Sequence, residues 1–187
     1  GSEDSLAGRA LTFRLQPFSQ GEIEQRVDDW VTRLSADPAG AIGRQPDRGD
    51  IVGRMVRGGF PAGEGLLPPA MGRWLQGAAG RPLAPASPGL GELQGPVLRR
   101  LLMLVAAAPG AELVLERFAE TLGVARSTVQ RYLDILEALF ITPTLPQWSR
   151  SLTSRQTRRA KCYVTDSGLL AALNNHTAER LLSPLGV

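Results

Sequence analysis

Apolar residues recur at helical spacing in two neighbouring segments of residues 114–140. The first segment carries one apolar face, made by Leu115, Phe118, Ala119 and Leu122. The second carries another, made by Val129, Tyr132, Leu133, Leu136 and Phe140. Gly123 stands where a left-handed residue ends a helix, and Ser127 or Thr128 either caps the next helix or lies in its first turn. The pattern predicts a helix-turn-helix.

The segments around this motif complete a small domain. Residues 96–107 have a buried helical face, with Pro96 at the start and Pro109-Gly110 at the end. Residues 140–145 and 161–165 are rich in β-forming residues and predict a hairpin, or wing. Asp166 or Ser167 is expected to cap a short helix over 168–173, and residues 177–182 make another. We therefore predict a mainly α fold with a small β-hairpin, that is, a winged helix-turn-helix.

The N-terminal half predicts a smaller helical segment. Residues 11–15 resemble a strand, and Ser19 with Glu22 forms a capping box. The helix that it opens is expected to reach about residue 34, with these apolar side chains inward: Ile23, Val27, Trp30, Val31 and Leu34. Residues 51–56 predict a short helix that Gly58-Gly59 stops, and residues 69–76 predict another.

Residues 77–95 contain five glycines and three prolines with almost no large apolar side chains. This composition is typical of a surface loop, so we expect a boundary there. The predicted organisation is residues 1–76, a linker over 77–95, and the winged helix-turn-helix over 96–187.

Positive charge is concentrated in the second half. The net charge is −1 over residues 1–96 and +4 over residues 97–187, which gives the chain its +3. Five cations and no acid lie between residues 150 and 161: Arg150, Arg155, Arg158, Arg159 and Lys161. Such a cluster suits phosphates or an acidic partner, and a solvated hairpin is the alternative.

Few residues suggest other chemistry. The single cysteine, Cys162, lies in an apolar stretch and is interpreted as a small buried hydrophobe. The single histidine, His176, has no neighbouring ligand and is interpreted as a surface residue without a metal. One cysteine and no apolar run of membrane-spanning length lead us to expect a cytoplasmic protein with no membrane partner.

Four groups of residues, in order along the chain, carry a resemblance to one family. They are residues 5–9 with 15–22, the turn Gly58-Gly59-Phe60-Pro61, Trp74, and residues 123–139, 145–150 and 161–169. Together they resemble a prokaryotic family of AAA-type P-loop ATPases that carry a winged-helix domain and a restriction-nuclease-like domain. The first group looks like the end of the ATPase core, and the turn and Trp74 match a turn of that family and the tryptophan after it. The last three stretches resemble the winged helix and the segment after it.

The resemblance implies that this chain is a fragment, the end of an ATPase core followed by the winged helix. ATP and Mg would be cofactors of the parent protein, with none in this fragment, because the chain has no G-x-x-x-x-G-K-[ST] loop and Lys161 is its only lysine. We therefore expect no enzyme activity here. Residues 77–93 depart from the family, which has a helix with a tyrosine and an Arg-Asp pair there.

Two single residues have two interpretations each. The resemblance implies that Arg9 lies near the nucleotide site of the parent protein as a sensor or arginine finger; it is otherwise an ordinary arginine before a strand. Asp166, before Ser167-Gly168, looks like an active-site acid, but a helix cap explains it as well and is preferred.

Two functions remain open for the fragment. In the first, the second helix of the motif enters the DNA major groove with Arg126, Ser127, Gln130 and Arg131 outward, while the basic cluster contacts phosphates. Asp134 and Glu137 lie further along that helix and oppose this function by charge repulsion. In the second, the domain is a protein-interaction or oligomerisation module that couples the ATPase to a partner or to neighbouring subunits. The first is favoured.

Overall fold

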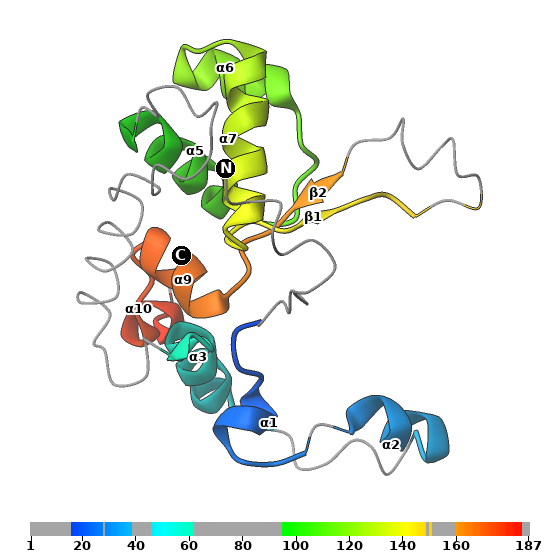
Figure 1. Cartoon of the computed structure of the whole chain (residues 1–187). Helices are drawn as coiled ribbons and strands as arrows, with labels where there is room; N and C mark the ends of the chain where they lie inside the picture. The colour runs from blue at the N-terminus through cyan, green and yellow to red at the C-terminus, as the bar shows by residue number, and fades with distance from the viewer. Residues whose placement is uncertain are drawn as a thin grey trace, which may run out of the picture.

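The computed structural model describes residues 16–27, 29–38, 46–61, 95–148, 150 and 160–184. The predicted strand at 11–15, the helix at 69–76, and residues 77–94 of the linker lie outside these ranges, as do Arg9, Arg155, Arg158 and Arg159. In the described residues, helices dominate and one small antiparallel sheet is present (Figure 1). The mainly α fold with a small hairpin is confirmed.

Three helices form the main core: α5 (Gly95–Ala107), α6 (Leu115–Leu122) and α7 (Arg126–Ala138). Leu101 of α5 and Val129 of α7 are fully buried, and Tyr132 is 1% exposed. Cys162 joins this cluster from the hairpin. The periodicity of the sequence located this core because each helix contributes one apolar face.

The wing consists of β1 (Thr144–Leu145) and β2 (Lys161–Cys162), which pair antiparallel with Thr144 opposite Cys162. These strands are shorter than the predicted 140–145 and 161–165. Phe140 has a positive φ of 59°, so residues 140–143 turn before the ladder begins. The other edge of β2 is also bonded, because the Leu113 N–H donates to the Ala160 carbonyl at 2.9 Å.

The N-terminal helix is interrupted, contrary to the prediction. The capping box of Ser19 and Glu22 is present, but α1 (Gln20–Ile23) has only one turn. Gln25 adopts φ of 53°, a left-handed conformation that ends it, and a separate α2 (Trp30–Ala36) follows. Trp30 and Val31 are 60% and 70% exposed, so these side chains do not face inward. Val27, also expected inside, is exposed as well.

Helix α3 (Arg48–Arg57) lies against the last two helices, α9 (Ser167–Leu173) and α10 (Ala178–Leu182) (Figure 1). Asp47 caps α3, and Arg48 donates from Nη2 to the Leu181 carbonyl at 2.9 Å. The sequence analysis assigned α3 to the predicted region 1–76, and α9 and α10 to the predicted domain 96–187. These parts contact each other, and the exact boundaries stay a prediction.

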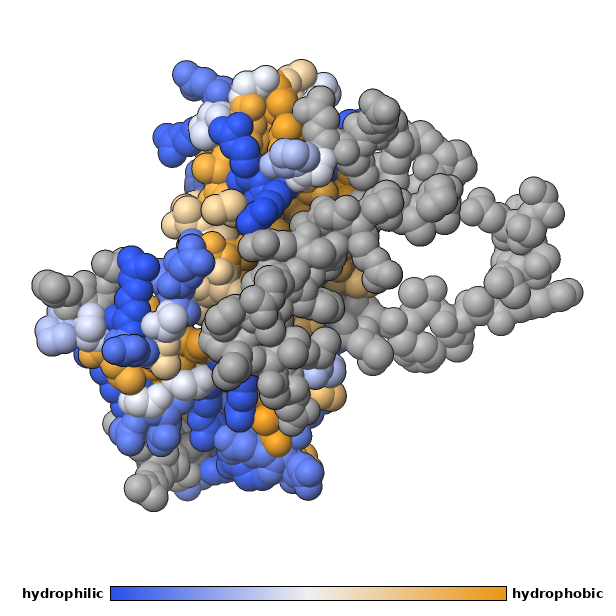
Figure 2. All heavy atoms as spheres, turned by 90° about the vertical axis from the view of Figure 1, so that its left-hand side faces the viewer, coloured by the Kyte–Doolittle hydropathy of each residue, from blue (hydrophilic) through white to orange (hydrophobic). Residues whose placement is uncertain are grey.

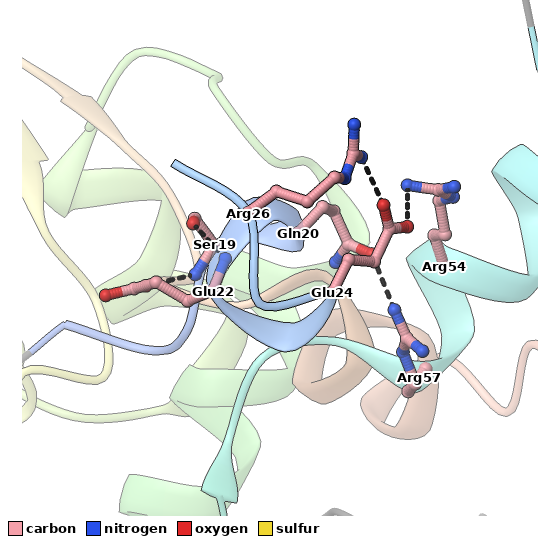
Figure 3. Close-up of polar contacts among 7 residues, drawn as sticks. All are labelled: Ser19, Gln20, Glu22, Glu24, Arg26, Arg54 and Arg57. Atoms are coloured by element: carbon pink, nitrogen blue, oxygen red, sulfur yellow. Dashed lines mark hydrogen bonds and ion pairs between the residues drawn. The ribbon is translucent and has the colours of Figure 1, made fainter. Parts of the chain in front are cut away.

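Polar side chains connect α1 with α3 (Figure 3). Glu24, just after α1, pairs with Arg54 of α3 and with Arg26. Arg57 donates to the Gln20 side-chain oxygen at 2.7 Å. Figure 2 shows mostly hydrophilic residues on the lower part of the molecule, where Figure 1 places α1 and α3. These bonds hold the one-turn α1 in place, since a helix of four residues has little stability of its own.

Candidate nucleic-acid interface

The turn of the helix-turn-helix has the geometry that the sequence predicts. Gly123 adopts φ 68° and ψ 35°, and its N–H and that of Val124 donate to the last carbonyls of α6. Helix α7 begins at Arg126, with Ala125 as N-cap and no side-chain capping bond. Ser127 therefore lies in the first turn of α7 and does not cap it.

The first turns of α7 expose three of the four residues that were expected to read DNA. Arg126, Ser127 and Gln130 are exposed, whereas Val129 and Tyr132 of the same helix are buried. In a helix-turn-helix, the N-terminal residues of the second helix are the ones that reach base edges. Arg126, Ser127 and Gln130 are therefore accessible at the start of α7, and their role in reading DNA stays a prediction.

Arg131 differs from the prediction. This side chain is half-buried, and its Nε is enclosed without a hydrogen-bond partner in the described part of the chain. Its guanidinium carbon lies 5.4 Å from the ring centroid of Tyr132. The enclosed Nε shows that the Arg131 side chain packs against neighbouring protein atoms and is not freely exposed as Arg126 is.

Two acids bond the outward residues of α7. The Arg126 Nε lies 2.9 Å from Glu116 Oε1 of α6, and Gln130 donates to Asp134 Oδ1 at 2.8 Å. Glu137, the other acid expected to oppose DNA, is half-buried and accepts a hydrogen bond from Thr144 of the wing at 2.6 Å. Sequence reasoning missed these bonds, although the four-residue spacing of Gln130 and Asp134 is a recognisable signal.

The wing carries part of the basic cluster. Lys161, in β2, and Arg150, after β1, are exposed. Arg155, Arg158 and Arg159 lie outside the described residues, so the cluster as a whole stays a sequence prediction. An exposed cation at the base of the wing suits a phosphate contact.

Cys162 is buried, as expected, at 3% exposure. Burial raises the pKa of its thiol to about 11, and the charge of Glu137 acts in the same direction. The thiol is therefore protonated at neutral pH and is a poor nucleophile. His176 is half-buried, less exposed than the surface position that was expected, and its backbone N–H donates to the Ala171 carbonyl at 2.8 Å.

Asp166 is buried and accepts two backbone hydrogen bonds. Its carboxylate caps α9 by accepting the Leu169 N–H at 2.8 Å, and it also accepts the Gly59 N–H at 2.7 Å. The side chain is only 6% exposed, and these two bonds satisfy it. The preferred capping interpretation is confirmed. The sequence analysis did not predict the hydrogen bond to Gly59, which lies 107 residues earlier in the chain.

Other kinds of site are not found in the described residues. No group of three or more His, Cys, Asp or Glu side chains is arranged to hold a metal within those ranges. None of the described helices combines the length and the apolar composition that crossing a bilayer needs.

Comparisons with known proteins find similarity to part of the chain. Residues 91–180, which include the helix-turn-helix and the wing, match a family described as a domain of unknown function, DUF8612. The chain is also similar to two uncharacterized proteins, Mb2031c of Mycobacterium bovis and Rv2008c of Mycobacterium tuberculosis. Each is 41% identical over 64 residues, which is 34% of this chain and 13% of the relative. The chain thus matches a small part of these relatives' length.

The chain is also similar to a solved structure, the transcriptional regulator SlyA. The superposition covers 62% of this chain and 78% of the SlyA chain, with a TM-score of 0.32 and 18% sequence identity. The winged-helix assignment rests on the three core helices and the hairpin of this chain. The family, the two mycobacterial proteins and the structure named here are not described as ATPases or nucleases, so that link stays a proposal.

Proposed function

We propose that this chain is a winged-helix DNA-binding module. The observation that carries the proposal is the exposed start of α7, where Arg126, Ser127 and Gln130 follow the Gly123 turn. These residue types form the hydrogen bonds by which proteins read the major groove. The exposed Lys161 and the basic stretch between residues 150 and 161 supply cations for phosphates.

Fluorescence anisotropy on a labelled duplex at low salt tests this function. The Arg126→Ala variant is expected to weaken binding to a preferred sequence by about tenfold, within the range for one bidentate base contact. Arg99→Ala is the matched control, because it removes an exposed arginine from α5, outside the helix-turn-helix. Equal affinity of the two variants contradicts a reading role for Arg126.

The wider setting that we propose is a regulatory part of a larger AAA-type ATPase. The support is the set of motifs that resemble that family, Gly58-Gly59-Phe60-Pro61 among them, and the small share of the mycobacterial relatives that this chain spans. In that setting Arg9 would lie near the ATP and Mg site of the parent protein, and the fragment itself would have no enzyme activity.

A second candidate is a protein-interaction or oligomerisation module. The observation that favours it is apolar surface near the wing: Leu145 and Trp148 are 56% and 73% exposed. Sedimentation equilibrium of the chain and of a Trp148→Ser variant tests self-association. A dimer that the substitution dissociates supports the module, and a monomer at all concentrations argues against oligomerisation through this surface.

A further inference from the structure

We propose that Glu116 and Asp134 are positioning residues that set Arg126 to read a guanine and Gln130 to read an adenine one or two base pairs away. This inference rests on the proposed DNA binding and names the sequence that the module would select. It also gives a role to two acids, Glu116 of α6 and Asp134 of α7, whose charge would otherwise oppose DNA binding.

Arg126 is held by its inner nitrogen. Its Nε pairs with Glu116 Oε1 across the turn, from the start of α7 to α6. The guanidinium carries five N–H donors in a planar fork. The bond to Glu116 uses the Nε edge and leaves the two terminal nitrogens outside it. A pair of guanidinium nitrogens is the group that donates to guanine O6 and N7 in the major groove.

Gln130 is held by one amide hydrogen. A carboxylate accepts but does not donate, so the group that faces Asp134 Oδ1 at 2.8 Å is the Gln130 NH₂. The bond leaves the side-chain oxygen and the second N–H of Gln130 outside it. One acceptor beside one donor matches adenine, which presents the N6 donor and the N7 acceptor.

The spacing of the two residues fits neighbouring base pairs. Arg126 and Gln130 are four residues apart on α7, which is about 6 Å along a helix axis. Successive bases in B-DNA are about 3.4 Å apart along each strand, so the two contacts fall one or two steps apart. The exposed Ser127 lies between them and suits either a base or a phosphate.

Fixing these side chains before binding lowers the conformational entropy that binding has to remove. A long side chain that was free before binding loses conformational freedom when binding orders it. Each acid bears a negative charge that is unfavourable near phosphates, and screening reduces that cost at an exposed site. The net effect of each acid on affinity is therefore expected to be small. Its effect on base preference is expected to be large.

Selection from a library of randomised 20-base-pair duplexes, with the whole chain, tests the inference. The selected site is expected to contain a G and an A one or two steps apart. Asp134→Ala is expected to lower the preference for that A over G at least threefold, and Gln130→Ala about tenfold. Glu116→Ala is expected to lower the preference for the G and leave the A unchanged. Anisotropy on duplexes with single base changes measures each ratio.

Two variants separate positioning from loss of charge or structure. Asp134→Asn keeps an acceptor oxygen and is expected to restore the preference for A. Glu120→Ala removes one negative charge from an exposed position of α6, and it is expected to leave both preferences intact. Far-ultraviolet circular dichroism establishes that each variant is folded.

The outcomes distinguish this inference from the function it rests on. If the unmodified chain binds no duplex at low salt, both fail. If it binds duplexes without base preference, DNA binding stands and the inference is overturned. A selected C that Asp134→Ala abolishes also overturns it, because Asp134 would then read the base directly. Equal effects of Asp134→Ala and Glu120→Ala contradict a positioning role.

Discussion

The carboxylate of Asp166 accepts the Gly59 N–H at 2.7 Å and thereby fixes the end of α3 to the start of α9. Three chain segments meet at this point. A Cβ on Gly58 would lie 2.4 Å from Asp166 Oδ1, and a Cβ on Gly59 would lie 2.1 Å from the Phe18 carbonyl oxygen. A Cβ on Gly168 would lie 2.8 Å from the Arg57 carbonyl oxygen. The glycines of two motifs noted in the sequence therefore serve one close approach of backbones.

Gly58 and Gly123 provide a contrasting test of this packing. Both have positive φ, 67° and 68°, but Gly58 has ψ −161°, a conformation essentially restricted to glycine, whereas Gly123 is left-handed with ψ 35° and no atom lies within 4 Å of a Cβ on it. Gly123→Ala is expected to cost about 1 kcal/mol, which is the left-handed strain alone. Gly58→Ala combines a greater backbone strain with a clash against a buried carboxylate and is expected to cost roughly 3 kcal/mol or more. Urea denaturation measures both free energies of unfolding, and equal losses contradict the close approach.

Asp166→Asn tests the two hydrogen bonds of the carboxylate. An amide has one acceptor oxygen, so one of the two N–H groups loses its partner, and the NH₂ meets a donor in its place. The expected loss is about 1–3 kcal/mol, the cost of a buried unsatisfied polar group. Asp47→Asn, at the exposed cap of α3, is the control and is expected to change stability by less than that. Similar losses at the two caps would show that the bond to Gly59 contributes nothing.

The raised pKa of the Cys162 thiol predicts that the free energy of unfolding falls at high pH. The folded state keeps the thiol proton to a pKa of about 11, whereas the unfolded chain loses it near the ordinary value. The unfolded state therefore binds fewer protons between these two values, and stability falls as pH rises through that window. Guanidinium titrations of the chain and of Cys162→Ala from pH 8 to 11 measure this. The difference between the two proteins is expected to shrink as pH rises, and a constant difference contradicts the shift.

Local patterns predicted the helix-turn-helix because its information is contained in adjacent residues. The apolar face of α7 and the left-handed Gly123 are both legible in the sequence. The break at Gln25 is not, since the apolar spacing continues through it while the backbone turns. The Arg126–Glu116 pair and the Asp166–Gly59 bond are also hidden, because the fold brings each pair together from separate elements.

The lack of a Walker A loop predicts that this chain neither binds nor hydrolyses ATP. Backbone amides of that loop and its lysine hold the phosphates of P-loop enzymes, and the chain has no such sequence. Isothermal titration calorimetry with ATP and Mg is expected to show no heat of binding. A micromolar dissociation constant would contradict the expectation.

The salt dependence of DNA binding tests the central claim most directly. Each phosphate contact lowers log K by about 0.9 per unit of log salt on duplex DNA. Changing Arg158 and Arg159 together to Ala is expected to flatten that slope by about two and to weaken binding to all sequences alike. The measurement is anisotropy of a labelled duplex over a salt series, with the unmodified chain beside the double variant. Binding with a steep slope that the double variant flattens is the predicted result, and no affinity of the unmodified chain at low salt would contradict the account.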